Sequence, residues 1–138
     1  MKKYSRRLPI ILLLCMFFLT GCAQSKLSDK FDEEEVKEQA ETAIAYFNER
    51  DYQSIVDMGS EELKASITAE QFADASDPYL DKCGEFEKIS KTVVLGSSDK
   101  ETGADYGGVV MVGVYEKGRI QFTIAFDEDM KLVQFMIK

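Results

Sequence analysis

The chain contains no histidine and no tryptophan, and it has only three cysteines and two prolines among its 138 residues. Without histidine it cannot form a Ser-His-Asp or Cys-His nucleophilic site, and it cannot form a zinc site that depends on imidazole ligands. Any acid–base chemistry would therefore have to use Asp, Glu, Tyr or Lys. These exclusions hold for every fold that the chain could adopt.

The three cysteines have different expected fates. Cys15 lies in an apolar amino-terminal stretch that we expect to be removed, and Cys22 stands just after that stretch. Only Cys83 is left for the folded part, so we predict neither a disulfide within the chain nor a thiolate metal cluster. A single exported cysteine is most often a small buried apolar residue, with pairing between chains or reactivity as the alternatives.

Charge is distributed unevenly along the chain. Met1–Gly21 contains four of the 17 Lys and Arg residues and no acidic residue, so all 25 acidic residues and 13 bases lie beyond Gly21. That part carries a net charge of −12. Such a balance repels phosphate, which argues against nucleic-acid binding, and its simplest role is to keep the protein soluble.

The amino-terminal segment has the layout of a secretory signal. Four basic residues precede the apolar stretch Leu8–Leu19, which runs into the small residues Thr20 and Gly21. A membrane-spanning helix needs about 20 apolar residues to cross roughly 30 Å of hydrocarbon, and this stretch is shorter than that. We therefore predict that residues 1–21 are a signal peptide.

The four residues Leu19-Thr20-Gly21-Cys22 resemble the lipobox of bacterial lipoproteins. In that family the cysteine sulfur receives a diacylglyceryl group, and cleavage leaves the modified cysteine as the first residue. The resemblance implies lipidation of Cys22, a lipidated cysteine and tether over residues 22–29, and a location on the outer, extracytoplasmic face of the cell membrane. Two acyl chains give stable attachment, which an acidic domain needs because its charge does not attract it to a bilayer.

The first half of the remaining chain has helical periodicity. Apolar residues recur on one face of a helix that begins near Phe31 with Asp32 as its cap, and a second short helix is expected after Asp51 and before Gly59. A further helical turn is expected within residues 60–67. A capping box at Thr68–Gln71 begins the last helix, which Pro78 limits or kinks and Gly84 closes.

After Gly84 the period changes to two, which predicts strands. The expected strands are residues 86–95, a strand around Val109–Tyr115 that is apolar on both faces and therefore central, residues 119–126 and residues 130–137. A long hairpin loop is expected over residues 96–105. Helices followed by an antiparallel meander of about four strands predict one α+β domain over residues 30–138.

This order resembles the nuclear-transport-factor-2-like, cystatin-like cone fold, and more narrowly the small bacterial lipoproteins that carry a domain-of-unknown-function version of it. The likeness covers roughly Asp29–Lys138 and consists of spacing patterns such as the polar break Asn48-Glu49-Arg50-Asp51-Tyr52. It implies a curved sheet around the helices and a cone-shaped cavity. No catalytic motif of the enzymatic relatives is matched, so no catalytic residue is carried over.

These features favour a membrane-tethered, non-catalytic binding or accessory module. Its partners would be the membrane through the lipid anchor, and an envelope protein, a small apolar ligand or a second copy of the chain. If the cone cavity binds a ligand, its candidate lining residues are Tyr46, Phe47, Tyr79 and Tyr106, for each of which core packing is the alternative. We predict no metal and no cofactor.

Two other functions are left open by the sequence. The first is a small cone-fold enzyme that uses Asp or Glu with Tyr, which requires a carboxyl group whose pKa is raised by burial. The second is a calcium-responsive domain, because Asp74, Asp77 and Asp81 recur at roughly helical spacing. A solvated acidic face is the simpler interpretation of these three residues.

Overall fold

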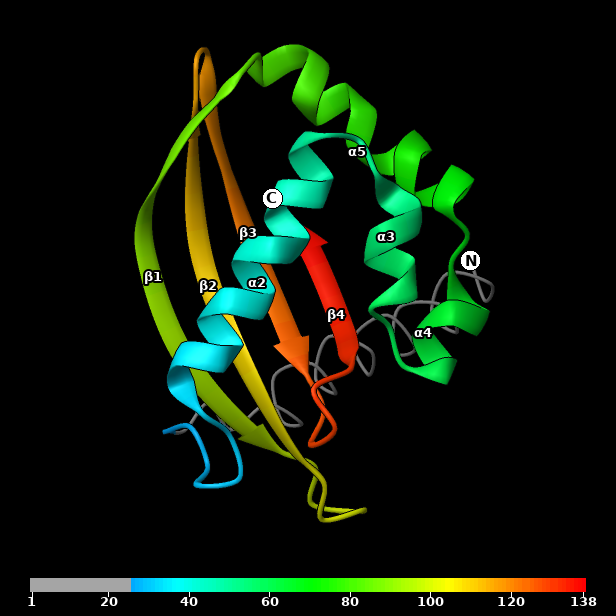
Figure 1. The fold of residues 1–138 in the computed structure, drawn as a ribbon, viewed down its shortest axis with the longest axis vertical. Helices are drawn as coiled ribbons and strands as arrows, with labels where there is room; N and C mark the ends of the chain where they lie inside the picture. The colour runs from blue at the N-terminus through cyan, green and yellow to red at the C-terminus, as the bar shows by residue number, and fades with distance from the viewer. Residues whose placement is uncertain (1–25) are drawn as a thin grey trace, which may run out of the picture.

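The computed structural model describes residues 26–138. The predictions for the signal segment, for Cys15 and for the lipidation of Cys22 lie outside these residues. Within the described range, four helices are followed by four strands (Figure 1). The predicted order, with the helices first and then an antiparallel meander, is confirmed.

Each helix begins after a residue whose side chain accepts hydrogen bonds from the first turn. Asp32 accepts from the N–H groups of Glu34 and Glu35, and Thr68 and Gln71 form the predicted capping box. The local sequence therefore sets where these helices begin. The helices are α2 (Glu33–Asn48), α3 (Tyr52–Asp57), α4 (Glu61–Ser66) and α5 (Ala69–Cys83).

Helix α5 continues through Pro78. The sequence suggests that this proline limits or kinks the helix, yet α5 extends five residues beyond it. A proline inside a helix removes one backbone hydrogen bond. The buried side chains of Phe72, Leu80 and Cys83, which lie on either side of the proline along the helix, offset that loss. The helix ends at Gly84, whose φ of 77° is left-handed.

The four strands form one antiparallel sheet in the order β1-β2-β3-β4. Ser98 pairs with Asp105, so β1 is longer than expected and the connection to β2 is shorter than the predicted loop over residues 96–105. The prediction that Val109–Tyr115 forms a central strand is confirmed, because β2 pairs with β1 and β3. The strands are β1 (Phe86–Ser98), β2 (Asp105–Tyr115), β3 (Gly118–Phe126) and β4 (Leu132–Ile137).

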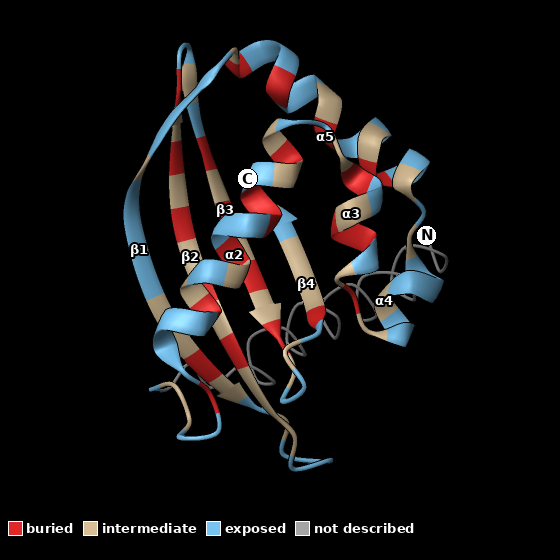
Figure 2. Ribbon diagram, in the orientation of Figure 1, coloured by how far each residue is buried: buried red, intermediate tan, exposed pale blue. Residues whose placement is uncertain are grey.

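The two faces of the sheet have different environments. The helices pack on one face, which buries alternate residues of β2 and β3 such as Met111, Ile120 and Phe122 (Figure 2). Val110 and Val112 point to the opposite face and are half-buried. The apolar character of both faces of β2 therefore does not lead to burial on both, because no described helix covers the outer face.

The segment just before α2 is packed against the sheet. Leu27 and Phe31 lie over Gly107, where a Cβ atom would approach the ring of Phe31 to 2.9 Å, and the N–H of Phe31 donates to the carbonyl of Ser28. The Lys30 ammonium lies 3.3 Å from carboxylate oxygens of both Asp105 and Glu128. The packed domain therefore begins at about Leu27, ahead of the expected boundary at residue 30.

Candidate functional site

The space between α2 and the sheet is filled by aromatic side chains. The ring of Phe47 is fully buried and meets Phe122 edge-on, with ring centroids 5.2 Å apart. It also contacts Tyr52 at 6.2 Å and Phe135 at 5.8 Å. Phe47 therefore packs in the core and does not line an open cone-shaped cavity.

The other three candidate ligand residues lie on three different elements, α2, α5 and β2. Tyr46 is half-buried against the core, and Tyr79 on α5 is 41% exposed. Tyr106 lies near the start of β2, where partial burial, together with the nearby acidic side chains Asp99 and Glu62, raises its pKa. The structure does not bring these tyrosines and Phe47 together in one site.

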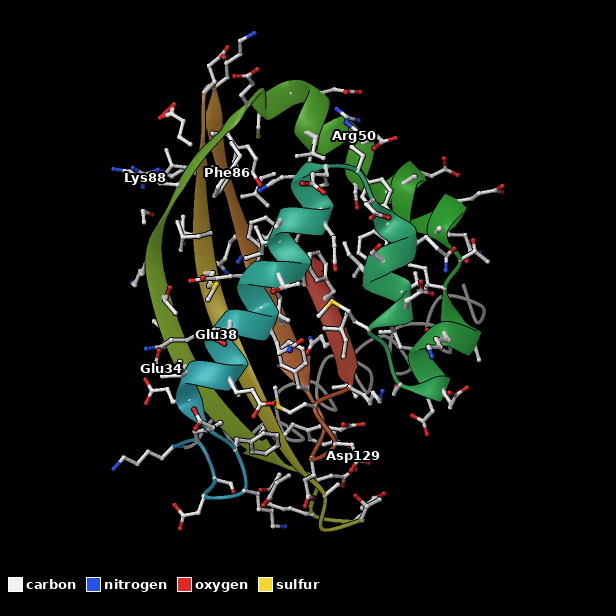
Figure 3. The ribbon with its side chains drawn as sticks, viewed as in Figure 1. Glu34, Glu38, Arg50, Phe86, Lys88 and Asp129 are labelled. Carbon is white, nitrogen blue, oxygen red and sulfur yellow. The ribbon has the colours of Figure 1, made fainter. Side chains whose placement is uncertain are left out.

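A groove of about 610 Å³ lies instead at the other end of β2, where α2, α5, β1 and the β2–β3 turn meet. Figure 3 shows Arg50 and Phe86 at this end of the molecule, with Asp129 at the opposite end. The groove combines aromatic, amide and charged side chains. Its lining residues are Asn48, Arg50, Leu80, Asp81, Gly84, Glu85, Phe86, Tyr115 and Glu116.

Backbone hydrogen bonds hold the turn of the β2–β3 hairpin against the connection between α5 and β1. The N–H of Glu116 donates to the carbonyl of Glu85, and the N–H of Lys117 donates to the carbonyl of Cys83, each at 2.8 Å. The left-handed conformation of Gly84 lets the chain reverse between them. The positions of Glu85 and Glu116 on the groove are therefore set by the backbone.

An aromatic pair forms one wall of the groove. Tyr115 is only 3% exposed, and its hydroxyl donates to Oδ1 of Asn48 at 2.5 Å. Its burial raises the pKa of this hydroxyl, which therefore stays protonated and remains a donor. Phe86 packs edge-on against Tyr115, with ring centroids 5.4 Å apart, yet it is 39% exposed. The groove thus presents an accessible ring on a rigid support.

A charged network forms the opposite wall. Arg50, which follows α2 in a left-handed conformation with φ of 59°, places its guanidinium 2.9 Å from Asp77 and 2.7 Å from Asp81. The hydroxyl of Tyr52 also donates to Asp77. The bond to Asp81 is the main cause that raises the pKa of Arg50, and burial is the main cause that raises the pKa of Tyr52.

This network bears on the calcium hypothesis, because it contains two of the three residues on which that hypothesis depends, Asp77 and Asp81. The carboxylates of Asp77 and Asp81 both accept from Arg50, so the guanidinium already balances their charge. Among residues 26–138, no group of three or more acidic or cysteine side chains is arranged to hold a metal ion. The structure therefore gives no support to a calcium site on α5.

The enzyme alternative requires a buried carboxyl group that faces a cavity. Within residues 26–138 no Asp or Glu is buried, and the acidic residues of the groove, Asp81, Glu85 and Glu116, are exposed. A general acid of the expected kind needs a carboxyl group that is withdrawn from water. The described residues therefore offer no acid–base pair of the expected kind.

The sequence did not identify the groove residues, because they come from the ends of four elements, α2, α5, β1 and β2. Asn48 and Arg50 stand in a polar break, and Glu116 stands in a hairpin turn. Local patterns therefore identify them only as parts of the connections between elements. The hydrogen bond between Tyr115 and Asn48 joins residues 67 positions apart. The sequence offered only one signal for these residues, which is that polar residues stand next to the ends of the helices and strands.

A family model described as "Protein of unknown function (DUF3887)" matches residues 40–135. The chain belongs to the DUF3887 family. The match includes every lining residue of the groove, from Asn48 to Glu116. It confirms the expectation of a domain of unknown function, whereas the finer likeness to the nuclear-transport-factor-2-like class stays a prediction.

A protein of similar fold has been determined by NMR. The structure of a protein from Ruminococcus gnavus ATCC 29149 superposes with a TM-score of 0.73 at 35% sequence identity, covering 82% of this chain and 96% of that one. It supports the α+β architecture of helices on an open four-stranded sheet. No curated protein matches the chain. None of the helices described is both long and apolar enough to cross a membrane.

Proposed function

We propose that this DUF3887 protein is a membrane-tethered, extracytoplasmic binding module, and that its ligand site is the groove between α2, α5 and the β2–β3 turn. The observation that carries the proposal is the exposed ring of Phe86, held against the buried Tyr115 beside three exposed carboxylates. Large aromatic side chains on rigid supports are the usual anchors of binding sites.

The charges of the groove favour a cationic ligand. Asp81, Glu85 and Glu116 are acidic, whereas Arg50 is the one basic lining residue, and its guanidinium is already bound by Asp77 and Asp81. Within residues 26–138, neither Glu85 nor Glu116 forms an ion pair. A positively charged group above the face of Phe86 would be attracted by the ring as well as by these carboxylates. The expected ligand is a basic peptide segment with apolar side chains.

We expect a short peptide of alternating Lys and Leu to bind the protein, and a peptide of alternating Glu and Leu to bind at least tenfold more weakly. The Phe86→Ala variant should lose about tenfold in affinity for the basic peptide, because it removes the accessible ring. Calorimetric titration of the purified protein measures both effects.

Two matched controls separate a specific site from general attraction to an acidic protein. Val93→Ala removes a side chain that is as exposed as Phe86, but on the outer face of the sheet. Glu116→Gln and Glu101→Gln each remove one negative charge, and only the first lies on the groove. Equal weakening by both glutamine variants would show that the groove is not the site.

The tether rests on the lipobox resemblance of Leu19–Cys22. The Cys22→Ala variant is expected to lose incorporation of a labelled fatty acid completely and to leave the membrane fraction, because the variant lacks the sulfur that receives the lipid. Metabolic labelling and membrane flotation measure these outcomes. Continued labelling of the variant would contradict lipidation at this residue.

A further inference from the structure

The domain separates its charges between two layers. Helices α2 to α5 contain 12 acidic residues and three basic ones, whereas the four strands contain two acidic residues, Glu87 and Asp105, and three basic ones. The strong negative charge of the chain therefore belongs mainly to the helical layer. The strands carry no excess of acidic residues, and it is such an excess that would repel an anionic surface.

The basic residues of the strands lie together on the outer face of the sheet. The register pairs Val114 with both Lys88 and Arg119, and it pairs Val112 with Lys91. Val112 and Val114 face away from the helices, because the intervening residues of β2 are the buried ones. The side chain of Lys88 projects from β1 on the side away from α2 (Figure 3).

These three cations differ from most of those of the helical layer. Lys37 on α2 and Lys64 on α4 form ion pairs, as does Arg50 after α2, whereas Lys82 on α5 forms none among residues 26–138. Among residues 26–138, no ion pair involves Lys88, Lys91 or Arg119. The outer face therefore presents three cations that form no ion pair with a described acidic side chain.

Apolar side chains lie between and beside these cations. Val93 is 38% exposed and Met136 is 48% exposed, and a shallow hollow of about 280 Å³ lies on the same face. It is lined by Lys91, Val93, Leu95, Val110, Val112 and Gln121. Cations around exposed apolar side chains are the combination that binds the surface of an anionic bilayer.

The covalent tether can reach this side of the domain. Lys26 and Leu27 run beside Gly96, where a Cβ atom would approach the carbonyl oxygen of Lys26 to 2.4 Å. Four residue steps separate Lys26 from Cys22 and span at most about 14 Å. Packed layers of a protein are about 10 Å apart, which is less than this reach. The lipid attachment point can therefore lie beyond the outer face of the sheet.

We infer that the outer face of the sheet, with Lys88, Lys91 and Arg119, rests on an anionic lipid leaflet. This inference depends on the proposed anchor at Cys22, which holds the domain at the surface so that a weak local attraction is enough to orient it. The acidic helical layer is then directed away from the membrane. The groove beside Phe86 lies on the helical side of the sheet, so it stays open to solvent and to ligands.

The test compares the rates at which lysines of the lipidated, full-length mature protein react with a water-soluble amine reagent. The protein is reconstituted on vesicles of phosphatidylcholine, with or without about a third of phosphatidylglycerol. On the anionic vesicles we expect Lys88 and Lys91 to react about fivefold more slowly than on the neutral ones, with Lys82 on α5 unchanged. Salt at 0.5 M should remove the difference, because it screens exposed charges. Mass spectrometry of the digested protein gives each rate.

A variant pair sharpens the result. The double variant Lys88→Gln, Arg119→Gln should lose the protection of Lys91, whereas Lys64→Gln, Lys82→Gln, which removes the same charge from the helical layer, should keep it. Equal rates for Lys88, Lys91 and Lys82 on protein that floats with the vesicles would overturn the orientation and leave the anchor intact. Protection of Lys88 and Lys91 in detergent without vesicles would also overturn it, since a second copy would then cover this face. Protein that does not float with the vesicles would overturn both the anchor at Cys22 and the orientation.

Discussion

Phe47→Ala is expected to lower the free energy of unfolding by about 3–5 kcal/mol. The ring is fully buried and contacts the rings of Tyr52, Phe122 and Phe135, so it joins the helical layer to the sheet. Its removal leaves a cavity that the surrounding rings can fill only in part. Urea denaturation followed by circular dichroism measures the loss.

Phe86→Ala is the matched control for this prediction. Phe86 is 39% exposed and has one aromatic partner, Tyr115, so its truncation creates no enclosed cavity. We expect it to cost about 1 kcal/mol or less, although it weakens ligand binding. If Phe47→Ala cost no more than Phe86→Ala, the space between α2 and the sheet would not be filled in the way described.

Gly96→Ala is expected to cost about 3 kcal/mol, a large effect for the addition of one methyl group. The new Cβ atom would lie 2.4 Å from the carbonyl oxygen of Lys26 and 3.0 Å from Cα of Leu27. Both are backbone atoms, so the residues before α2 would have to shift, and we expect them to leave the sheet. The tether would then lengthen, because Leu27 and Phe31 would no longer be packed over Gly107.

Two measurements test this second prediction. Thermal unfolding gives the loss of stability, and hydrogen exchange at Phe31, whose N–H is bonded to Ser28, reports whether the segment has detached. Ser97→Ala is the control, since it changes the next residue of β1 on the other face of the sheet. Unchanged exchange at Phe31 in Gly96→Ala would mean that the segment shifts without leaving the sheet.

Much of the fold could be predicted from local patterns. The caps at Asp32 and Thr68 and the change of period after Gly84 identify the order of helices and strands, because these signals act over a few residues. The exceptions have physical causes. Pro78 does not end α5, since tertiary packing on both sides of it outweighs one lost hydrogen bond, and β1 is longer than expected because Ser98 pairs with Asp105.

The site could not be predicted in the same way. Of the four candidate ligand residues, Phe47 packs in the core, and the helical spacing of apolar residues that includes it is the same for a core ring and for a cavity wall. Whether a ring is covered depends on what the rest of the chain places against it. The groove residues Asn48, Phe86 and Tyr115 come together only when the ends of α2, β1 and β2 meet.

The sequence by itself determined the composition-based exclusions, the expected anchor at Cys22, the α+β order and the acidity of the chain, because these depend on residue type and short-range spacing. Only the tertiary structure decided how that acidity is divided. The pairing of β1, β2 and β3 brings Lys88, Lys91 and Arg119 onto one face of the sheet. The helices place their acids on the opposite side of the domain. Net charge is a sum over the chain, whereas an interaction surface depends on which charges the fold brings together.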